Sequence, residues 1–341
     1  MKSAQYGYTS LYTHLANKVS SDGVLSDPSG ALVIKPCTTA EISFYESLTA
    51  SHPDLAPYLP TFMGTLSLSG DQSAATDAVE SGFVQTEHGI ERLHGRKLDT
   101  ELHIVLENIT HGFKKPNVLD LKLGKQLWDE GASAEKRRRL DKVAEESTSG
   151  SLGFRIAGMR TYMGEEGKVP EPEPEVAEFV EKVHEGGYWT YNKMYGRWFN
   201  AENVIKGLEA FILPGAKTED EIERAKDVIT YFLDEVKGAQ KVFESKESRM
   251  YSASILLVYE GDIETYKETK KLLAEAAKKL KEEEGDVDEV PPRKLAAVKL
   301  IDFAHATWQP GQGPDENALR GIRSIVTILD DVQKQLESTT A

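Results

Sequence analysis

The chain has 341 residues, a length that suits one large domain or two lobes on either side of a cleft. Its formal net charge of −15 argues against direct, general binding of nucleic acid. Cys37 is the only cysteine, which excludes an internal disulfide, disfavours a structural zinc site and predicts a reducing compartment. No apolar run is long enough to cross a membrane, and the first residues lack the apolar stretch of a secretory signal, so we expect no membrane span.

The first third of the chain is typical of a small lobe of strands and helices. Strands are predicted at residues 31–35, 61–68 and 101–109. Apolar residues at helical spacing predict a helix over 38–50, and Thr38 and Glu41 have the spacing of a capping box at its start. The small polar run 69–81 predicts a loop.

The rest of the chain is typical of a larger lobe. Strands are predicted at 117–123, 154–162, 254–259 and 296–303, and helices at 133–146, 218–245 and 317–336. Thr218 and Glu221 have the spacing of a second capping box. The Pro- and Glu-rich run 170–174 predicts a stiff connector. The charged run 264–284 predicts either an exposed helix or a partly disordered insertion.

A basic island interrupts this acidic chain. Residues 114–142 carry nine lysines and arginines against five acidic residues. Such a run is most often the solvated face of a helix, and the alternative is a site for a local anionic ligand.

The run Pro116 to Gly124 carries the first chemical signal. Because side chains alternate along a strand, Asp120 and Lys122 should project from the same side. A carboxylate that holds a hydroxyl and an ammonium that neutralises a phosphoryl group would suit phosphoryl transfer. The alternative is an ordinary surface ion pair.

Four segments together resemble the inositol polyphosphate kinase family. Pro116, Asp120, Lys122 and Gly124 fill every fixed position of its P-x-x-x-D-x-K-x-G signature. Residues 152–160 resemble its G-F-x-x-x-G-M-R segment, and 301–305 resemble its I-D-F-A-H block. Residues 251–261 resemble its S-S-L-L block, with Ala253 in place of one serine and Ile255 in place of the first leucine. The resemblance runs from about residue 32 to 329, in the family's order.

This resemblance implies an α+β fold of two lobes with antiparallel sheets and the nucleotide in the cleft between the lobes. The N-terminal lobe would cover residues 1–110 and end at a hinge. The C-terminal lobe would cover 111–341, with a short inositol-phosphate-binding segment at 125–151 and a charged insertion at 262–290. Such a short segment is typical of the family's multikinase branch, which accepts several substrates.

The cofactors implied by the resemblance are ATP and Mg²⁺. Lys35 would contact the ATP phosphates, and Glu41 would either pair with Lys35 or cap its own helix. The backbone groups of Glu107 and Ile109 would bind the adenine edge at the hinge.

Metal and reacting groups are implied at the other end of the site. Asp302 would hold the metal, and Ser254 would add a hydroxyl to its shell. Lys122 would be catalytic together with Asp120. Asp120 would orient the ribose, act as a base, or do both.

The substrates implied are inositol polyphosphates, with a trisphosphate converted to tetrakis- and pentakisphosphates. The resemblance gives contacts to Lys122, Lys136, Arg160 and His305, and helical spacing adds Arg139 beside Lys136. The alternative for His305 is a packed histidine near the end of a strand.

Three alternatives stay open. Two are sister enzymes, a hexakisphosphate kinase and a dedicated trisphosphate 3-kinase. The third is a non-enzymatic scaffold for transcription factors. The chain has no P-loop, no H-R-D-x-x-x-x-N loop and no G-x-G-x-x-G loop, which argues against P-loop enzymes and protein kinases. We expect a monomer that occurs in the nucleus and the cytoplasm.

Overall fold

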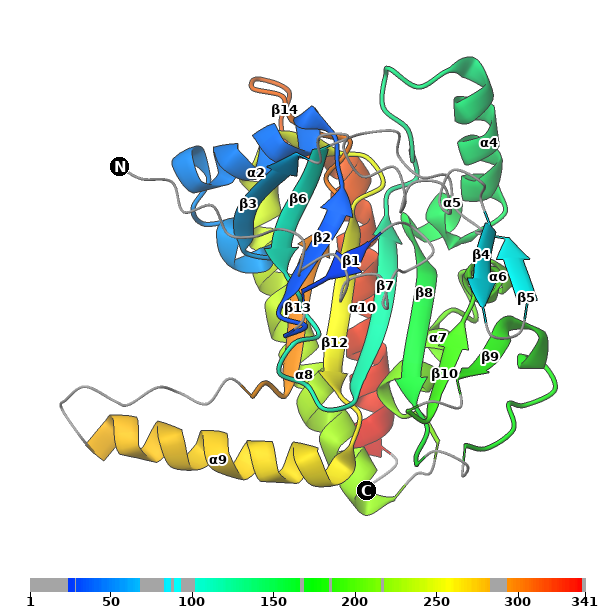
Figure 1. Cartoon of the computed structure of the whole chain (residues 1–341), viewed down its shortest axis with the longest axis vertical. Helices are drawn as coiled ribbons and strands as arrows, with labels where there is room; N and C mark the ends of the chain where they lie inside the picture. Colours follow the sequence, from blue (N-terminus) through cyan, green and yellow to red (C-terminus); the bar gives the residue numbers. More distant parts are fainter. Residues whose placement is uncertain are drawn as a thin grey trace. The chain divides into compact units, whose positions relative to one another are not determined.

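The computed structural model describes residues 24–338, with gaps at 28, 68–82, 87–88, 93–101, 166–168, 184–185, 216–217 and 283–292. The chain forms two compact units (Figure 1). The first comprises Met1–His52 and Pro60–His111, and the second comprises Pro53–Leu59 and Gly112–Ala341. No helix of the described residues is long and apolar enough to cross a membrane.

The first unit is built on a four-stranded antiparallel sheet. Its strand order is β1 (Leu25–Ser26), β2 (Leu32–Pro36), β6 (Leu102–Glu107) and β3 (Phe62–Ser67). A separate hairpin pairs β4 (Phe83–Thr86) with β5 (Gly89–Arg92). Helix α2 (Thr39–Ser51) follows β2 and packs on the sheet, since Tyr45 stacks on Phe62 of β3 with ring centroids 5.7 Å apart.

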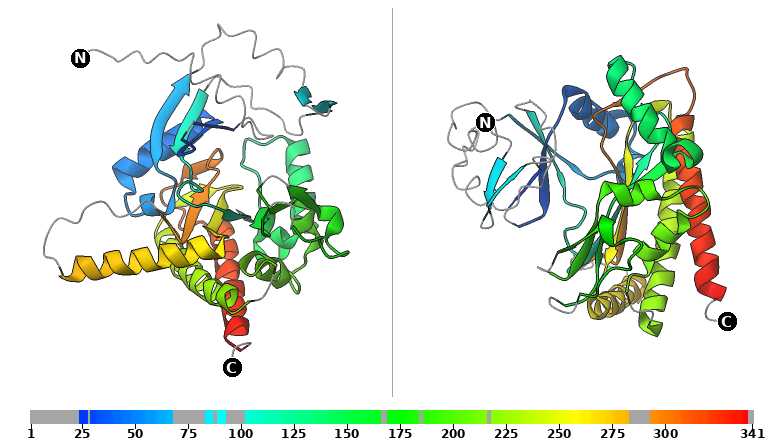
Figure 2. Two further views of the ribbon diagram at one scale, coloured as in Figure 1. Left: turned by 60° about the horizontal axis from the view of Figure 1, so that its bottom comes forward. Right: turned by 90° about the vertical axis from the view of Figure 1, so that its right-hand side faces the viewer.

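The second unit is built on a six-stranded antiparallel sheet. Its strand order is β13 (Ala296–Ile301), β12 (Ser254–Glu260), β7 (Pro116–Leu123), β8 (Phe154–Tyr162), β10 (Tyr188–Tyr191) and β9 (Val180–Val183). The long helices α8 (Glu219–Glu244) and α10 (Glu316–Ser338) run side by side on one face of this sheet (Figure 2). A small second sheet pairs β11 (Ser248–Met250) with β14 (Ala306–Trp308).

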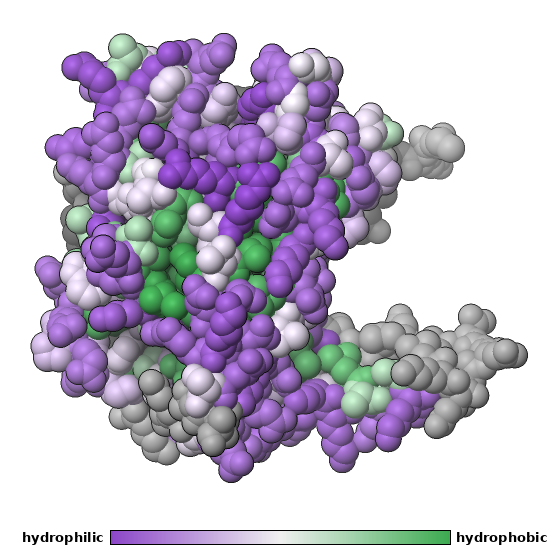
Figure 3. All heavy atoms as spheres, turned by 180° about the vertical axis from the view of Figure 1, so that it is seen from behind, coloured by the Kyte–Doolittle hydropathy of each residue, from purple (hydrophilic) through white to green (hydrophobic). Residues whose placement is uncertain are grey.

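Shorter helices complete the second unit. They are α4 (Ala134–Glu145), α5 (Thr148–Leu152), α6 (Lys193–Trp198), α7 (Ile205–Ile212) and α9 (Ile263–Glu282), with 3-10 turns at Ala56–Tyr58 and Ala177–Phe179. Seen from behind, the surface is mostly hydrophilic, and apolar residues gather in a central area and along part of α9 (Figure 3). Leu272 on α9 is one of the large apolar side chains that solvent reaches.

The core of the second unit lies between the sheet and the two long helices. The side chains of β7 alternate strictly: Leu119, Leu121 and Leu123 are fully buried, and the residues between them are half-buried. The apolar stripe of α10, which includes Ile322 and Leu329, is fully buried as well. Each such side chain contributes about 1.5–3 kcal/mol when it is removed from water.

Most predicted elements are confirmed. The strand over 154–162 and the helices over 133–146, 218–245 and 317–336 agree with β8, α4, α8 and α10 within two residues, and the capping box of Thr218 and Glu221 is present. The charged run 264–284 forms helix α9, which resolves its two alternatives over the described residues. The strand predicted over 296–303 is too long, because β13 ends at Ile301 and Asp302 turns the chain away. The predicted loop 69–81 lies outside the described residues.

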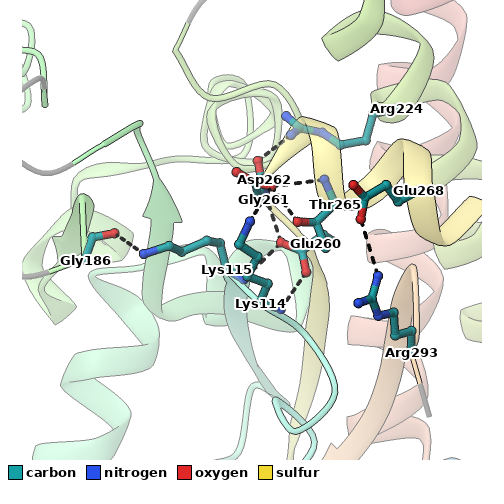
Figure 4. A network of polar contacts seen from close by, with 10 residues as sticks. All are labelled: Lys114, Lys115, Gly186, Arg224, Glu260, Gly261, Asp262, Thr265, Glu268 and Arg293. Atoms are coloured by element: carbon teal, nitrogen blue, oxygen red, sulfur yellow. Dashed lines mark hydrogen bonds and ion pairs between the residues drawn. The ribbon is translucent and has the colours of Figure 1, made fainter. Parts of the chain in front are cut away.

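A buried carboxylate fixes the chain just before β7 (Figure 4). Glu260, at the end of β12, is 1% exposed. It accepts hydrogen bonds from the backbone N–H groups of Lys114 at 2.7 Å, Lys115 at 3.0 Å and Asp262 at 3.0 Å. Buried polar groups are strongly unfavourable when they lose their partners. Glu260 therefore holds β7 and β12 in register at this end of the sheet.

Replacing Glu260 with Gln should lower the free energy of unfolding by about 2 kcal/mol, because an amide NH₂ would face backbone donors in place of an ionised oxygen. Urea unfolding at neutral pH measures this loss. Glu264→Gln is the matched control, since that side chain is 76% exposed and should change stability by less than about 1 kcal/mol. Equal stability of the two variants would contradict the anchoring role of Glu260.

Candidate functional site

A group of polar side chains occupies the face of the six-stranded sheet opposite α8 and α10. In the antiparallel register, Lys122 of β7 lies opposite Arg155 of β8 and Ser254 of β12. Paired residues of an antiparallel ladder project from the same face, and so do residues two apart on one strand. Asp120, Lys122, Arg155 and Ser254 therefore share one face.

The ammonium of Lys122 is held by two groups from distant parts of the chain. Its Nζ lies 2.7 Å from Oδ2 of Asp302 and donates to the carbonyl of Ser252 at 3.0 Å. The Lys122 side chain is 16% exposed, and that of Asp302 is 41% exposed. The structure thus brings together two predicted site residues that lie 180 positions apart in the sequence.

Backbone strain occurs on both sides of Lys122. Asp302 has φ +68° and Ser252 has φ +58°, the left-handed region that residues other than glycine rarely adopt. The Ser252 hydroxyl donates to the Leu127 carbonyl at 2.8 Å, which helps to hold this conformation. Such strain is found at functional sites more often than elsewhere.

Asp120 and Ser254 provide buried oxygens without hydrogen bonds. One carboxylate oxygen of Asp120 and the hydroxyl of Ser254 are shielded from solvent and unpaired among the described residues. Burial raises the pKa of Asp120, the charge of Lys122 opposes that rise, and the charge of Asp302 adds to it. The nearby Ser254 hydroxyl also lowers this pKa, although the two groups do not meet with normal hydrogen-bond geometry. Unpaired buried oxygens are uncommon and suggest that a ligand completes them.

A divalent cation fits these oxygens only with help from a bound molecule. Carboxylate and hydroxyl oxygens are the ligands that Mg²⁺ and Mn²⁺ prefer, and Mg²⁺ is commonly held by one or two carboxylates together with phosphates. Among the described residues, no three side chains of His, Cys, Asp or Glu form a metal site by themselves. Asp302, Ser254 and Asp120 thus suit a metal that phosphate groups also bind.

Gly124 directs the chain out of this site. It has φ +94°, and a Cβ there would lie 2.6 Å from Nδ2 of Asn317 on α10. The Asn317 side-chain oxygen accepts from the N–H groups of Lys125 and Gln126, each at 2.9 Å. The chain can therefore turn sharply toward α4 only because this position carries no side chain.

The basic island divides into inward and outward residues. Arg137 lies over the Trp128 ring at 4.5 Å and donates to the carbonyl of Ala132, so it holds the loop before α4. Lys136 is half-buried, and Arg139 is exposed. No hydrogen bond or ion pair joins Lys136 or Arg139 to the cluster around Lys122 within the described ranges.

Arg160 and His305 occupy different surroundings. Arg160 on β8 stacks over the Tyr188 ring at 3.8 Å and is exposed. Nδ1 of His305 contacts a carboxylate oxygen of Asp129, which belongs to the segment between β7 and α4. His305 is therefore tied to the segment after the signature, and its other ring nitrogen is the one that remains for a ligand.

The first unit carries its own predicted pair. Nζ of Lys35, at the end of β2, lies 2.8 Å from Oε1 of Glu41 on α2, and Glu41 is 1% exposed. The Thr38 side chain accepts from the Glu41 N–H at 3.2 Å. The structure thus has only half of the capping box, because the Glu41 carboxylate goes to Lys35.

The end of β6 has the backbone pattern that a hinge needs. The N–H of Glu107 donates to Thr61 O at 2.9 Å, and its side chain accepts from the Thr61 hydroxyl at 3.0 Å. For the Ile109 N–H no hydrogen bond occurs within the described residues. The amide of Ile109 is therefore a group that suits a ligand here.

Arg155 is the residue of this face to which the sequence analysis gave no role. The signal was present, because Arg155 lies in the segment 152–160 and its alternation places it with Lys122. Its Nη1 donates to the hydroxyl of Ser149 on α5 at 3.0 Å.

Asp120→Asn should be at least as stable as the parent at about pH 7. A carboxyl whose pKa is raised by folding destabilises the fold when it ionises, so this penalty is present above the folded pKa. The difference in free energy of unfolding between the parent and Asp120→Asn should disappear as the pH falls toward the ordinary carboxyl pKa of about 3.9. Urea unfolding at a series of pH values measures this dependence.

Asp262→Asn is the control of opposite sign. Although burial opposes ionisation of Asp262, hydrogen bonds from Thr265 together with the charge and hydrogen bond of Lys114 outweigh burial and lower the pKa of Asp262. Its ionised form stabilises the fold, so this variant should lose stability at neutral pH and lose less as the pH falls. An Asp120 variant that behaves in the same way would contradict the dominant effect of burial at Asp120.

Known proteins resemble the chain over most of its length. A sequence model of the family described as inositol polyphosphate kinase matches residues 103–330. The inositol polyphosphate multikinase of Saccharomyces cerevisiae is 30% identical, over 93% of this chain and 97% of that protein. Inositol hexakisphosphate kinase 1 of Rattus norvegicus is 29% identical, over 72% of this chain and 55% of that protein. The crystal structure of the S. cerevisiae inositol phosphate multikinase Ipk2, in complex with ADP and Mn²⁺, matches with TM-score 0.63 and 31% identity, over 89% of this chain and 99% of that chain. The chain therefore belongs to the inositol polyphosphate kinase family.

Proposed function

We propose that this chain transfers the terminal phosphoryl group of ATP to hydroxyls of inositol polyphosphates. The observation that carries the proposal is the cluster of Asp120, Lys122, Ser254 and Asp302 on one face of the six-stranded sheet. It combines one ammonium with unpaired hard oxygens, as phosphoryl transfer requires. A relative of 31% identity that binds ADP and Mn²⁺ supports the same chemistry.

Each residue of the cluster has a role in this proposal. Asp302 and the Ser254 hydroxyl hold the divalent cation, Mg²⁺ in the cell, which neutralises the phosphates when it is bound. Lys122 moves between Asp302 and the phosphoryl oxygens. Asp120 orients the ribose or the accepting hydroxyl, and its raised pKa also suits a proton acceptor. The step is mainly positioning and electrostatics, so it does not depend on a base.

In this proposal the first unit binds the nucleotide. The Lys35–Glu41 pair is the arrangement that holds ATP phosphates in kinase-like folds. The carbonyl of Glu107 and the amide of Ile109 serve the adenine edge. The functional boundary then lies between residues 110 and 111.

The substrate is an anion bound by a protein of net charge −15, so attraction must be local. Lys136, Arg139, Arg160 and His305 are the proposed contacts. Arginine forks grip phosphate oxygens in pairs, and lysines act as point charges. The short segment 125–151 leaves room for several substrates, from a trisphosphate upward. The similarity to hexakisphosphate kinases keeps that activity as the second candidate.

Asp302→Asn should abolish phosphorylation without loss of the fold, because it removes a metal ligand at a partly exposed position. The parent, the variant and a panel of inositol phosphates are incubated with ATP and Mg²⁺, and products are resolved by chromatography. Circular dichroism and thermal unfolding verify the fold. Turnover of the variant at the parent's rate would contradict the metal-binding role of Asp302.

Substitutions to Gln at Lys136, Arg139 or Arg160, one at a time, should mainly raise KM for the inositol phosphate. Each lost charge-assisted bond corresponds to roughly a 10- to 150-fold change, and KM for ATP should stay near the parent value. The effect should shrink at high salt because of screening. Lys142→Gln is the control on the helix of Lys136 and Arg139, since Lys142 pairs with Glu146 at 3.6 Å. If the Lys136 and Arg139 variants match that control, α4 is only a solvated helix, and if the Arg160 variant matches it too, the proposed pocket is wrong.

A further inference from the structure

A pair of arginines, Arg155 and Arg197, lies beside the cluster of Asp120, Lys122, Ser254 and Asp302 and has no role in the function proposed above. Arg155 projects from β8 on the face of Asp120 and Lys122, and Arg197 projects from α6. Both are half-buried. Among the described residues, the Arg155 side chain makes one hydrogen bond, to the neutral hydroxyl of Ser149 at 3.0 Å, and the Arg197 side chain makes no hydrogen bond or ion pair.

Tight packing keeps α6 beside Arg155. Strand β10 pairs with β8 only from Met159 to Tyr162, and the chain then enters α6, which covers the unpaired edge of β8. A Cβ at Gly196 would lie 1.8 Å from the carbonyl oxygen of Ile156, so the helix touches the strand backbone. Because Ile156 follows Arg155 and Arg197 follows Gly196, this contact brings the two arginines close together.

The two guanidinium groups repel each other. The pKa of Arg155 is lowered to about 10. Burial is the largest cause, the charge of Arg197 adds to it, and the charge of Asp120 opposes both. The fold therefore holds two guanidinium groups near each other in a partly desolvated place. The charge of Asp120 favours the cationic form of Arg155. A bound anion would relieve this repulsion.

We propose that Arg155 and Arg197 form a phosphate subsite that binds one ring phosphate of the inositol polyphosphate substrate. This proposal rests on the proposed function, and it adds a contact from β8 and α6 to those of α4. Two forks that converge on one phosphate would give bidentate bonds from two directions. The subsite adjoins Asp120, so the phosphate that it binds is near the reacting part of the ring. It should therefore decide which isomers are accepted.

The test compares Arg197→Gln with the parent on inositol phosphate isomers that differ by a single phosphate. Arg197 is chosen because its side chain bonds to no group among the described residues, whereas the Arg155 side chain also donates to Ser149. KM should rise about ten-fold or more for isomers that carry the bound phosphate, and it should stay at the parent value for isomers that lack this phosphate. KM for ATP should not change. Arg197→Lys should recover part of the loss, since it restores the charge without the fork.

Arg293→Gln is the matched control, an exposed arginine paired with Glu268 of α9 at 3.5 Å. It should match the parent with every isomer. If Arg197→Gln changes KM equally for all isomers, or for none while the parent remains active, the subsite is wrong and the proposed function stands. If Arg197→Gln lowers thermal stability and leaves KM unchanged, the subsite is also wrong, because Arg197 would then have a structural role. Absence of any ATP-dependent product from the parent would instead overturn the proposed function.

Discussion

The strict alternation of β7 is the constraint on which the rest of the structure depends. This strand lies inside the six-stranded sheet, between β8 and β12. Its leucines are fully buried toward α8 and α10, and that burial fixes which face the intervening residues must take. Asp120 and Lys122 consequently project together from the opposite face. A shift of one residue in the register of β7 would place both charges in the apolar core. Packing of the core therefore fixes the face on which these site residues lie.

Placing charges on this face has a cost in stability. Asp120 is buried enough for its pKa to rise, one of its oxygens has no partner among the described residues, and Asp302 adopts a left-handed backbone conformation. Each feature is unfavourable in the folded chain without a ligand. The packing of α8 and α10 and the hydrogen bonds of Glu260 supply the stability that offsets these unfavourable features. Ligand binding would then be favoured because it satisfies groups that the fold leaves unsatisfied.

Local charge differs from net charge in this protein. The chain is acidic overall, yet Lys122, Arg155, Arg160 and Arg197 lie on or beside one sheet face. Two acidic residues of this unit engage partners of their own: Asp129 contacts His305, and Glu260, at the other end of β7, accepts from backbone N–H groups. Acidic residues thus position cations and loops, and the remaining cations are available for an anion.

Local periodicity in the sequence was sufficient to predict the strands of the two sheets that carry the motifs, the helices α2, α4, α8 and α10, and the sharing of one side by Asp120 and Lys122. These features depend on neighbours within a few residues, which a single sequence records. The short segments that form β9, β10, α6 and α7 lack a strong period, and no element was predicted there.

Only the tertiary structure decided how distant residues pair. It joined Lys122 to Asp302, gave the Glu41 carboxylate to Lys35 in place of its own helix cap, turned Arg137 inward, and brought α6 against β8. Strand register and helix packing across long separations select these contacts, and no local pattern encodes that selection. The residue types of the site were therefore readable from the sequence, and of their partners only Lys35 for Glu41 was expected, as one of two alternatives.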